Sequence, residues 1–384
     1  MHPGPDRNVP DPGGSRSAAG WLVLLALAGL AAFLLVRPVL AGSVGDPPAV
    51  AQSSSPYAVH RPAGGVRGGG IVNIDTELGY RGTLAAGTGI ILNPSGLVLT
   101  NNHVIQGATV IRATDTRTRA TFTARVVGYD KSSDVAVIRL SGAKDAGLKP
   151  AAFGDSDKVA EGDPVTAKGN AGGKGGAPKV ARGKVTGRDQ SVVARDESDS
   201  SSEKLSGLIE TDAAIRPGDS GGPLYNAAGE VIGMDTAASA GFKMAKQDGA
   251  RGFAIPINRA LAIAEQIQHG QGGPKVHIGK TAMLGVNVKA ADGAPGAGGP
   301  AGQGGARGGG AQVVSTLADS PAEQLNIPPG AVITALDGKP VDSPTTLTDL
   351  LLLHHPGDTV ALTYQPPGGQ PVTQQLKLTD GPPQ

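Results

Sequence analysis

Residues 217–223 read Pro217-Gly218-Asp219-Ser220-Gly221-Gly222-Pro223, a single serine set among glycines. Glycines on both sides favour a tight turn that exposes the serine hydroxyl and makes backbone N–H groups available as donors. Such N–H groups can stabilise the negative charge that develops on a carbonyl oxygen. A serine hydroxyl is nevertheless a weak nucleophile unless a base lies within hydrogen-bond reach. The stretch therefore fits either an ordinary turn or a nucleophilic serine, and the rest of the chain must supply the base.

A candidate base and a candidate carboxylate precede this serine. Of the seven histidines, only His103 stands in a distinctive context, the stretch LTNNHVI at residues 99–105, where a strand end runs into a turn. Asp134 opens an otherwise apolar strand and is suited to fixing the orientation of an imidazole. Taken alone, Asp134 also fits a surface turn. Together the three predict a nucleophilic Ser220 served by His103 and Asp134.

The arrangement of strands decides between two folds that use such a serine. Residues 218–222 also fit the G-x-S-x-G turn of α/β-hydrolases, which requires alternating strands and helices and a histidine after the serine. Here His103 comes before Ser220, and the order His–Asp–Ser is that of chymotrypsin. The chain shows short β-type runs at 71–74, 88–92, 96–100, 124–127, 135–140, 231–234 and 253–257. The pattern predicts an all-β barrel or sandwich, followed by one helix with Asn258 as its N-cap.

Composition excludes several classes of protein. The 34 Lys and Arg residues nearly balance the 33 Asp and Glu residues, so the net charge of +1 gives no field that would hold a nucleic acid. The absence of cysteine excludes disulfides, a thiolate nucleophile and cysteine zinc sites. The 60 glycines and 30 prolines among 384 residues exclude a mainly helical protein.

The candidate chemistry at Ser220 requires no cofactor. Acyl transfer at a serine needs neither a metal nor an organic cofactor.

The N-terminus predicts export or anchoring. A polar tail of residues 1–20 precedes an apolar run that is unbroken from Trp21 to Val36 and continues, after an arginine and a proline, to residue 41. Residues 21–41 are thus either a transmembrane anchor or a signal peptide that is cleaved after a small-residue site. We expect a cytoplasmic tail and a single-pass membrane protein with its catalytic part outside the cytoplasm, or alternatively a secreted protein. Residues 42–70 read as a flexible linker.

Two further units follow the linker. The all-β unit spans 71–270, and a smaller α+β unit spans 277–380. The smaller unit opens with an expected strand at 283–288, and its two helices are predicted to begin at Ser320-Pro321 and Ser343-Pro344. A glycine-rich insertion at 293–310 has no collagen-like period and separates the first two strands.

These motifs resemble the HtrA (Deg) family of extracytoplasmic serine proteases, which combine a trypsin-like double β-barrel with a PDZ domain. The segments that carry the resemblance are 87–90, 99–105, 134–137, 154–156, 169–170, 211–215, 217–223 and 252–256. The resemblance implies that His103 is general base and then acid, that Asp134 orients it and that Ser220 is the nucleophile. It also implies an oxyanion hole made by the backbone N–H groups of Gly218 and Ser220.

The resemblance implies two recognition sites. Ala214 would stand at the floor of the specificity pocket, and since it is no carboxylate, cleavage after Lys or Arg is not expected. Met283, Leu284, Gly285 and Val286 match the PDZ loop whose N–H groups capture a peptide C-terminus, although a plain strand with one glycine has the same sequence pattern. The chain departs from the family pattern in that Asp219 stands where most members have Asn, and Lys168 replaces an apolar strand residue.

We therefore expect a serine endopeptidase that cleaves unfolded or misfolded proteins. Two alternatives stay open: a PDZ-dependent chaperone or scaffold with latent proteolysis, and a dedicated processing protease for one partner. The family also implies a homotrimer, but the aromatic residues that support trimers are not evident within 42–70.

Overall fold

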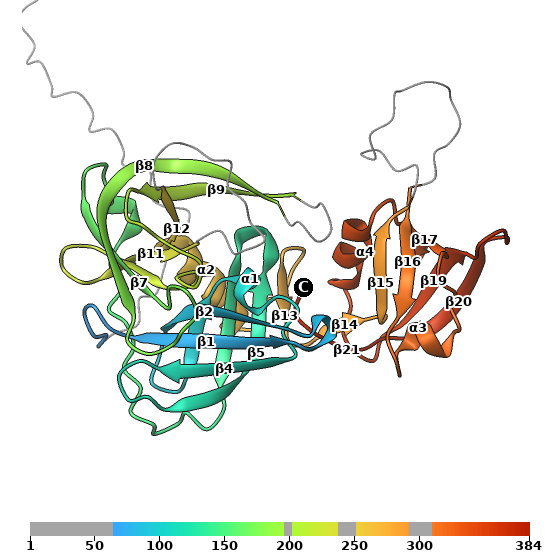
Figure 1. Ribbon diagram of the computed structural model, residues 1–384, viewed down its shortest axis with the longest axis horizontal. Helices are drawn as coiled ribbons and strands as arrows, with labels where there is room; N and C mark the ends of the chain where they lie inside the picture. Colours follow the sequence, from blue (N-terminus) through green and yellow to red (C-terminus); the bar gives the residue numbers. More distant parts are fainter. Residues whose placement is uncertain (1–63, 196–201, 237–250, 292–308) are drawn as a thin grey trace, which may run out of the picture. The chain divides into compact units, whose positions relative to one another are not determined.

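Two barrels and a separate small sheet make up the part of the chain that the computed structural model describes, residues 64–195, 202–236, 251–291 and 309–384 (Figure 1). The first barrel runs in the order β5-β4-β1-β2-β3-β6 and closes because β6 also pairs with β5, while β13 extends the sheet beyond β5. Its strands are β1 (Ile71–Leu78), β2 (Thr83–Ile91), β3 (Leu97–Thr100), β4 (Val110–Asp115), β5 (Thr121–Asp130), β6 (Val135–Leu140) and β13 (Val276–Ile278).

The second barrel is closed in the order β10-β11-β12-β9-β8-β7. Its strands are β7 (Pro164–Gly169), β8 (Lys179–Arg195), β9 (Ser202–Thr211), β10 (Pro223–Tyr225), β11 (Val231–Asp235) and β12 (Gly252–Pro256). All seven β-type runs of the sequence lie in strands of these two barrels or overlap them. The predicted all-β double barrel is thereby confirmed.

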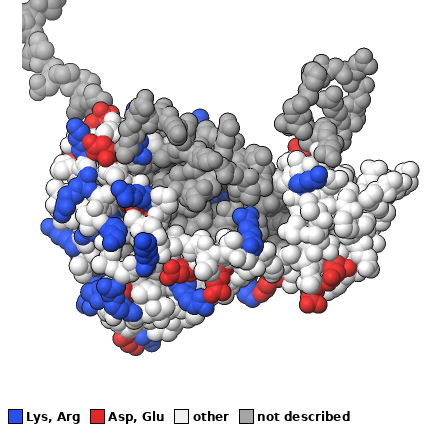
Figure 2. Space-filling model, in the orientation of Figure 1, with Lys and Arg blue, Asp and Glu red and all other residues white. Residues whose placement is uncertain are grey.

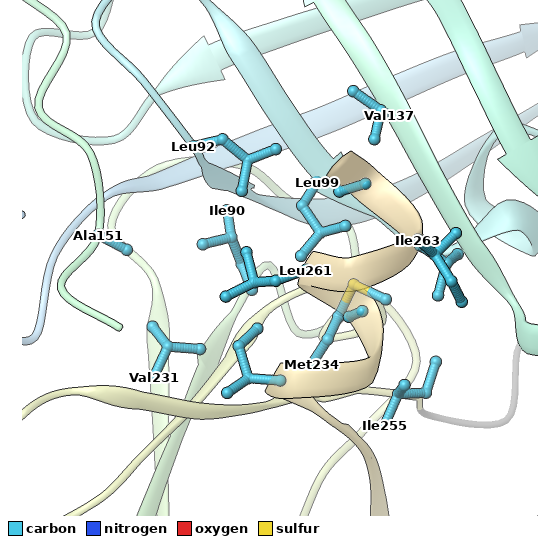
Figure 3. Packing of buried hydrophobic residues seen from close by; sticks show 14 of the residues in the cluster. Ile90, Leu92, Leu99, Val137, Ala151, Val231, Met234, Ile255, Leu261 and Ile263 are labelled. Atoms are coloured by element: carbon cyan, nitrogen blue, oxygen red, sulfur yellow. The ribbon is translucent and has the colours of Figure 1, made fainter. Parts of the chain in front are cut away.

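A shared hydrophobic core joins the two barrels to helix α2 (Ile257–Gln268). Ile90 and Leu99 of the first barrel and Met234 of the second lie in one cluster with Leu261, which is on the apolar face of α2 (Figure 3). These side chains are almost completely buried, and each contributes roughly 1.5–3 kcal/mol when it leaves water. The core fixes the two barrels against each other, so residues from both can share one site.

The predicted start of α2 was wrong by two residues. Asn258 does not cap the helix but lies in its first turn, and Pro256 is the N-cap residue. The Asn258 side chain donates to Asp155 at 2.8 Å, so a tertiary contact uses the amide that would otherwise cap the helix.

Short helical turns connect the barrel strands. They are η1 (Gly79–Arg81), α1 (Asn102–Ile105), η2 (Lys131–Ser133) and η3 (Ser156–Lys158). Two of them are important for the site, because α1 contains His103 and η2 ends at Asp134.

The C-terminal part of the chain forms its own sheet, in the order β15-β16-β17-β19-β20, with β18 beside β17 and a separate pair of β14 and β21. This unit has its own hydrophobic core, to which the strands of the sheet and helix α4 contribute side chains. The elements are β14 (Thr281–Met283), β15 (Val286–Ala290), β16 (Ala311–Thr316), α3 (Pro321–Gln324), β17 (Val332–Leu336), β18 (Lys339–Pro340), α4 (Pro344–Leu351), β19 (Thr359–Gln365), β20 (Val372–Lys377) and β21 (Thr379–Gly381).

Both predicted helix starts in this unit are confirmed. The hydroxyl of Ser320 accepts from the N–H of Glu323 at 3.2 Å, and that of Ser343 accepts from Thr346 at 3.1 Å. The single strand expected at 283–288 was wrong, since β14 and β15 are separate strands. Gly285 lies between them with φ of 80°, a left-handed conformation that interrupts a strand.

The N-terminal predictions concern residues outside the described part. The tail 1–20, the apolar segment 21–41 and most of the linker 42–70 are in this group, as is most of the insertion 293–310. Among the described residues, none of the helices has the length and apolar character needed to cross a membrane. Residues 66–70 do bind the second barrel: Lys168 donates to the carbonyl of Gly68 at 2.8 Å, which accounts for a lysine in β7.

Candidate active site

His103 and Asp134 form a close pair in the first barrel. His103 follows β3 on the short helix α1, and its Nδ1 lies 2.9 Å from Oδ2 of Asp134. The backbone N–H of His103 donates to the other carboxylate oxygen at 3.0 Å. Both side chains are largely buried, with exposed fractions of 10% and 6%. Because Asp134 engages Nδ1, Nε2 is the ring nitrogen on the side away from the Asp134 carboxylate.

The backbone around Asp134 explains why the carboxylate points at the histidine. Asp134 has φ of 53°, a left-handed conformation that aspartate tolerates better than most residues, and it ends η2. Asn101, which precedes α1, donates its side-chain N–H to the Asp134 carbonyl at 2.9 Å. Thr236, which follows β11 of the second barrel, donates its hydroxyl to Oδ2 at 3.0 Å. Sequence reasoning missed both partners.

Ser220 lies in a turn that only glycine-rich sequence can form. Gly218 has φ of 98° and Gly221 φ of 81°, and both are closely packed. A Cβ atom on Gly218 would lie 2.2 Å from the carbonyl oxygen of Asn170, and one on Gly221 would lie 2.2 Å from that of Thr88. The turn is held against β11 by two backbone bonds, from Gly221 to Asp235 at 2.8 Å and from Asp235 to Gly222 at 2.7 Å.

The serine turn and the histidine helix meet at β2. The Ser220 carbonyl accepts from the N–H of Thr88 at 2.8 Å. A Cβ atom on the neighbouring Gly87 would lie 2.6 Å from Val104 of α1 and 3.3 Å from the Ser220 carbonyl oxygen. The nucleophile candidate and the helix that carries His103 therefore pack against the same glycine, at the junction of the two barrels.

The peptide between Pro217 and Gly218 has a defined direction. Its carbonyl oxygen accepts from the N–H of Gly172 at 2.9 Å. In a planar trans peptide the N–H points opposite to the C=O. The N–H of Gly218 is therefore turned away from the loop that contains Gly172.

Two buried carboxylates flank the serine turn. Asp219 accepts from the N–H of Arg216 at 2.9 Å, and burial raises the pKa of its carboxyl group. Asp235 is fully buried, and burial together with the charge of Asp219 raises its pKa well above the ordinary value. Among the described residues neither Asp235 oxygen has a hydrogen-bond partner. The raised pKa and the absence of hydrogen-bond donors in the described part of the chain both favour the neutral, protonated form of the Asp235 carboxyl group.

The residues predicted for the specificity pocket and for the PDZ loop lie in different units of the fold. Ala214 is exposed in the segment between β9 and the serine turn, whereas the neighbouring Ile215 packs on the second barrel. Met283 ends β14, Leu284 is buried in the core of the C-terminal sheet, and Val286 begins β15. Within the described ranges, no group of three or more His, Asp or Glu side chains could hold a metal ion.

A double β-barrel that holds a histidine, an aspartate and a glycine-caged serine at its junction defines a trypsin-like serine protease. A trypsin-like peptidase domain family matches residues 87–234, and a PDZ domain family matches residues 282–378. The chain is 33% identical over 359 residues to the serine protease PepD of Mycobacterium tuberculosis. The aligned region covers 88% of this chain and 71% of PepD. It is also 33% identical over 302 residues to the Do-like serine protease HtrA of Lactobacillus helveticus. That aligned region covers 77% of this chain and 69% of the relative.

Among solved structures, an HtrA-type protease, AlgW with a decapeptide, aligns with a TM-score of 0.43 and 26% identity, covering 83% of this chain and 97% of that one. On the sequence relationships, the chain belongs to the HtrA family of serine proteases with a C-terminal PDZ domain.

Proposed function

We propose that this protease is an extracytoplasmic endopeptidase that hydrolyses peptide bonds in unfolded or misfolded proteins. The observation that carries the catalytic part is the paired hydrogen bonding of Asp134, which engages Nδ1 of His103 while Thr236 holds the same carboxylate oxygen. A histidine fixed in this way presents Nε2 as the base. The glycine-caged turn of Ser220 supports the assignment of the nucleophile.

In this proposal, Ser220 Oγ attacks the scissile carbonyl while His103 Nε2 takes its proton. The imidazolium that forms is stabilised by Asp134 and then protonates the leaving amine as the C–N bond breaks. The acyl group is left on Ser220, and a water molecule that His103 deprotonates hydrolyses the ester. The N–H groups of Gly218 and Ser220 would hold the oxyanion in both steps.

For specificity, we propose an apolar pocket next to the serine turn. No carboxylate stands at Ala214, and Ile215 follows it. Small or aliphatic residues before the scissile bond are therefore the expected substrates.

The PDZ domain is proposed to bind peptide C-termini. β15 is an edge strand of its sheet, so its outer side can accept a further strand. Val286, Val288 and Leu350 are partly buried apolar residues that pack on the core of this unit, as a peptide groove requires. The N–H groups of the segment 283–286 would hold the carboxylate.

The cellular setting is proposed from the sequence. Residues 21–41 would anchor or export the chain, with 1–20 in the cytoplasm, 42–70 as linker, and 71–270 and 277–380 as the protease and PDZ domains. A homotrimer is the proposed assembly. On the Gly218-Asp219-Ser220 form, we propose that the mycobacterial protease PepA is a particularly similar member. Nucleic acid is not a proposed partner, and basic and acidic groups both occur over the barrels on the face in Figure 2.

The test is degradation of β-casein, an unfolded protein, by the full-length chain and by its Ser220→Ala variant. Cleavage by the unmodified chain that disappears in the variant supports the proposed nucleophile. Equal cleavage by both chains would reject it. Binding of casein without cleavage would instead favour a chaperone or scaffold, and one cut in one partner with no cut in casein would favour a processing protease.

A further inference from the structure

Thr88 is a fully buried residue of β2 that the catalytic scheme does not use. Its hydroxyl donates to the carbonyl of Gly218 at 2.7 Å and accepts from the N–H of Asn170 at 2.9 Å. Its backbone N–H donates to the carbonyl of Ser220 at 2.8 Å. Through these three bonds, two of the side chain and one of the backbone, Thr88 links three parts of the chain: the first barrel, the serine turn and the loop that follows β7.

The first consequence concerns Gly218, one of the two proposed oxyanion donors. Glycine has the widest backbone freedom, so its N–H keeps one direction only if the peptides on both sides are held. The peptide before Gly218 is held by the bond from Gly172 to the Pro217 carbonyl at 2.9 Å. The peptide after it is held by the Thr88 hydroxyl. Without that hydroxyl, one side of Gly218 loses its restraint.

The second consequence concerns the loop that supplies the Gly172 donor. Asn170 begins this loop directly after β7, and its N–H donates to the Thr88 hydroxyl. The Asn170 side chain and carbonyl organise the rest of the loop by accepting from Gly175 at 2.8 Å and from Gly173 at 2.7 Å. The same hydroxyl therefore supports both restraints on Gly218, one directly and one through the loop.

Only a hydroxyl can do this, because it donates one hydrogen bond and accepts others at the same atom. The β-branched valine has the same shape as threonine but neither function. We propose that Thr88 is a positioning residue that keeps the oxyanion hole formed before substrate arrives. This inference rests on the proposed function, since it assigns a role to the N–H of Gly218 in catalysis. Thr88 itself does not contact the reacting atoms.

A residue that shapes the oxyanion hole acts on the transition state more than on substrate binding. The test compares full-length chains with Thr88→Val, Thr88→Ser and Thr76→Val on a short quenched peptide. Thr76 is the matched control: it is equally buried in the first barrel and donates to the Ala85 carbonyl at 3.3 Å, but it does not contact the serine turn. Loss of one oxyanion donor costs about 10²–10³-fold in kcat in enzymes of this kind.

We expect Thr88→Val to lower kcat about 10²-fold with KM changed by less than about threefold. Thr88→Ser should stay within about threefold of the unmodified chain, and Thr76→Val should keep its kcat. An unchanged kcat in Thr88→Val, while Ser220→Ala is inactive, would overturn the inference and leave the proposed function intact. Equal losses in Thr88→Val and Thr76→Val would also overturn it, because they would indicate general destabilisation.

Amide hydrogen exchange provides a readout that does not depend on activity. Segments 168–173 and 216–222 should exchange faster in Thr88→Val but not in Thr88→Ser or Thr76→Val. Unchanged exchange would overturn the inference even if the proposed function had already failed. Should Thr88→Val not fold, Thr88→Cys, whose thiol is a weak donor, replaces it in both measurements.

Discussion

The hydroxyl of Thr236 donates to Oδ2 of Asp134 at 3.0 Å, across the junction of the two barrels. The same oxygen lies 2.9 Å from His103 Nδ1. Asp134 ends η2 in the first barrel, and Thr236 directly follows β11 in the second. The orientation of the proposed catalytic histidine therefore depends on a residue that the other barrel supplies.

Replacing Thr236 with Val should impair catalysis without unfolding the protein. The variant keeps the shape of the side chain but leaves Oδ2 with one donor fewer, in a buried place where hydrogen bonds to a charged group contribute about 1.5–3 kcal/mol. We expect kcat to fall about tenfold, which corresponds to about 1.4 kcal/mol, while KM stays unchanged. Steady-state kinetics and urea unfolding measure the two effects. Thr236→Ser keeps the donor and should restore kcat; a Thr236→Val chain as active as the unmodified one would contradict the role.

Asp134→Asn should have a much larger effect. An amide at this position can offer an N–H to His103 Nδ1, which favours the wrong tautomer and removes the charge that stabilises the imidazolium. We expect kcat to fall about 10⁴-fold with little change in KM. The kinetics should be measured on the same short peptide.

Asp130→Asn is the control for this change. Asp130 is a buried aspartate four residues earlier that accepts from the N–H of Ser133 at 3.1 Å and so caps η2. Asparagine caps helices about as well as aspartate, so this variant should keep most of its activity. If both variants lost activity equally, the effect would come from the local structure and not from His103.

The predictions that came true from sequence were those with a local signal. Short β-type runs predicted the barrel strands, and the capping motifs predicted the starts of α3 and α4. The glycines around Ser220 and the setting of His103 are also short motifs, and the roles assigned to these residues stay predictions. These features are encoded within a few residues, so a single sequence is enough to find them.

Contacts between distant segments could not be predicted in this way. Thr88 lies 130 residues from Gly218, and Thr236 lies 102 residues from Asp134. In the sequence each is one more threonine in or beside a β-type run, where β-branched residues are common. The break at Gly285 was missed for a related reason. The glycine is required by the approach of Ser320, whose Cβ would lie 2.1 Å from a Cβ added there, and no local pattern reveals that approach.

Asp235→Asn should change how stability depends on pH. Burial and the charge of Asp219 raise the pKa of Asp235 in the folded protein. The folded state therefore binds this proton more tightly than the unfolded state, whose aspartates titrate at about 3.9. It follows that this group stabilises the fold at low pH and that the contribution is lost as pH rises through the folded pKa.

Asparagine cannot ionise, so the variant should lose less stability than the unmodified chain as pH rises from about 4 to 8. Urea unfolding at several pH values measures the difference. The pH slope is the relevant quantity, because a new buried amide also shifts stability at every pH. Parallel curves for the two chains would mean that Asp235 titrates similarly in both states.

Gly285→Ala should weaken peptide binding by the PDZ domain. Gly285 has φ of 80°, and its carbonyl accepts from the N–H of Leu317 at 2.8 Å. An added methyl group would collide with Ser320 as well as strain the backbone. The segment 283–286 would have to move, and with it the N–H groups that are proposed to hold a peptide carboxylate. We expect the dissociation constant for a hydrophobic C-terminal peptide to rise at least about tenfold, equivalent to about 1.4 kcal/mol.

Gly338→Ala separates the collision from the strain. Gly338 lies between β17 and β18 of the same unit with φ of 72°, and an added Cβ atom there meets no other atom within 4 Å. It should cost stability, roughly 1 kcal/mol for a left-handed alanine, but leave peptide binding intact. Fluorescence anisotropy of a labelled peptide measures binding in both variants, and cleavage of a short substrate by the barrels should persist in both. Equal binding by Gly285→Ala and Gly338→Ala would show that the segment 283–286 is not the carboxylate site, and an amidated peptide that binds as tightly as the free acid would lead to the same conclusion.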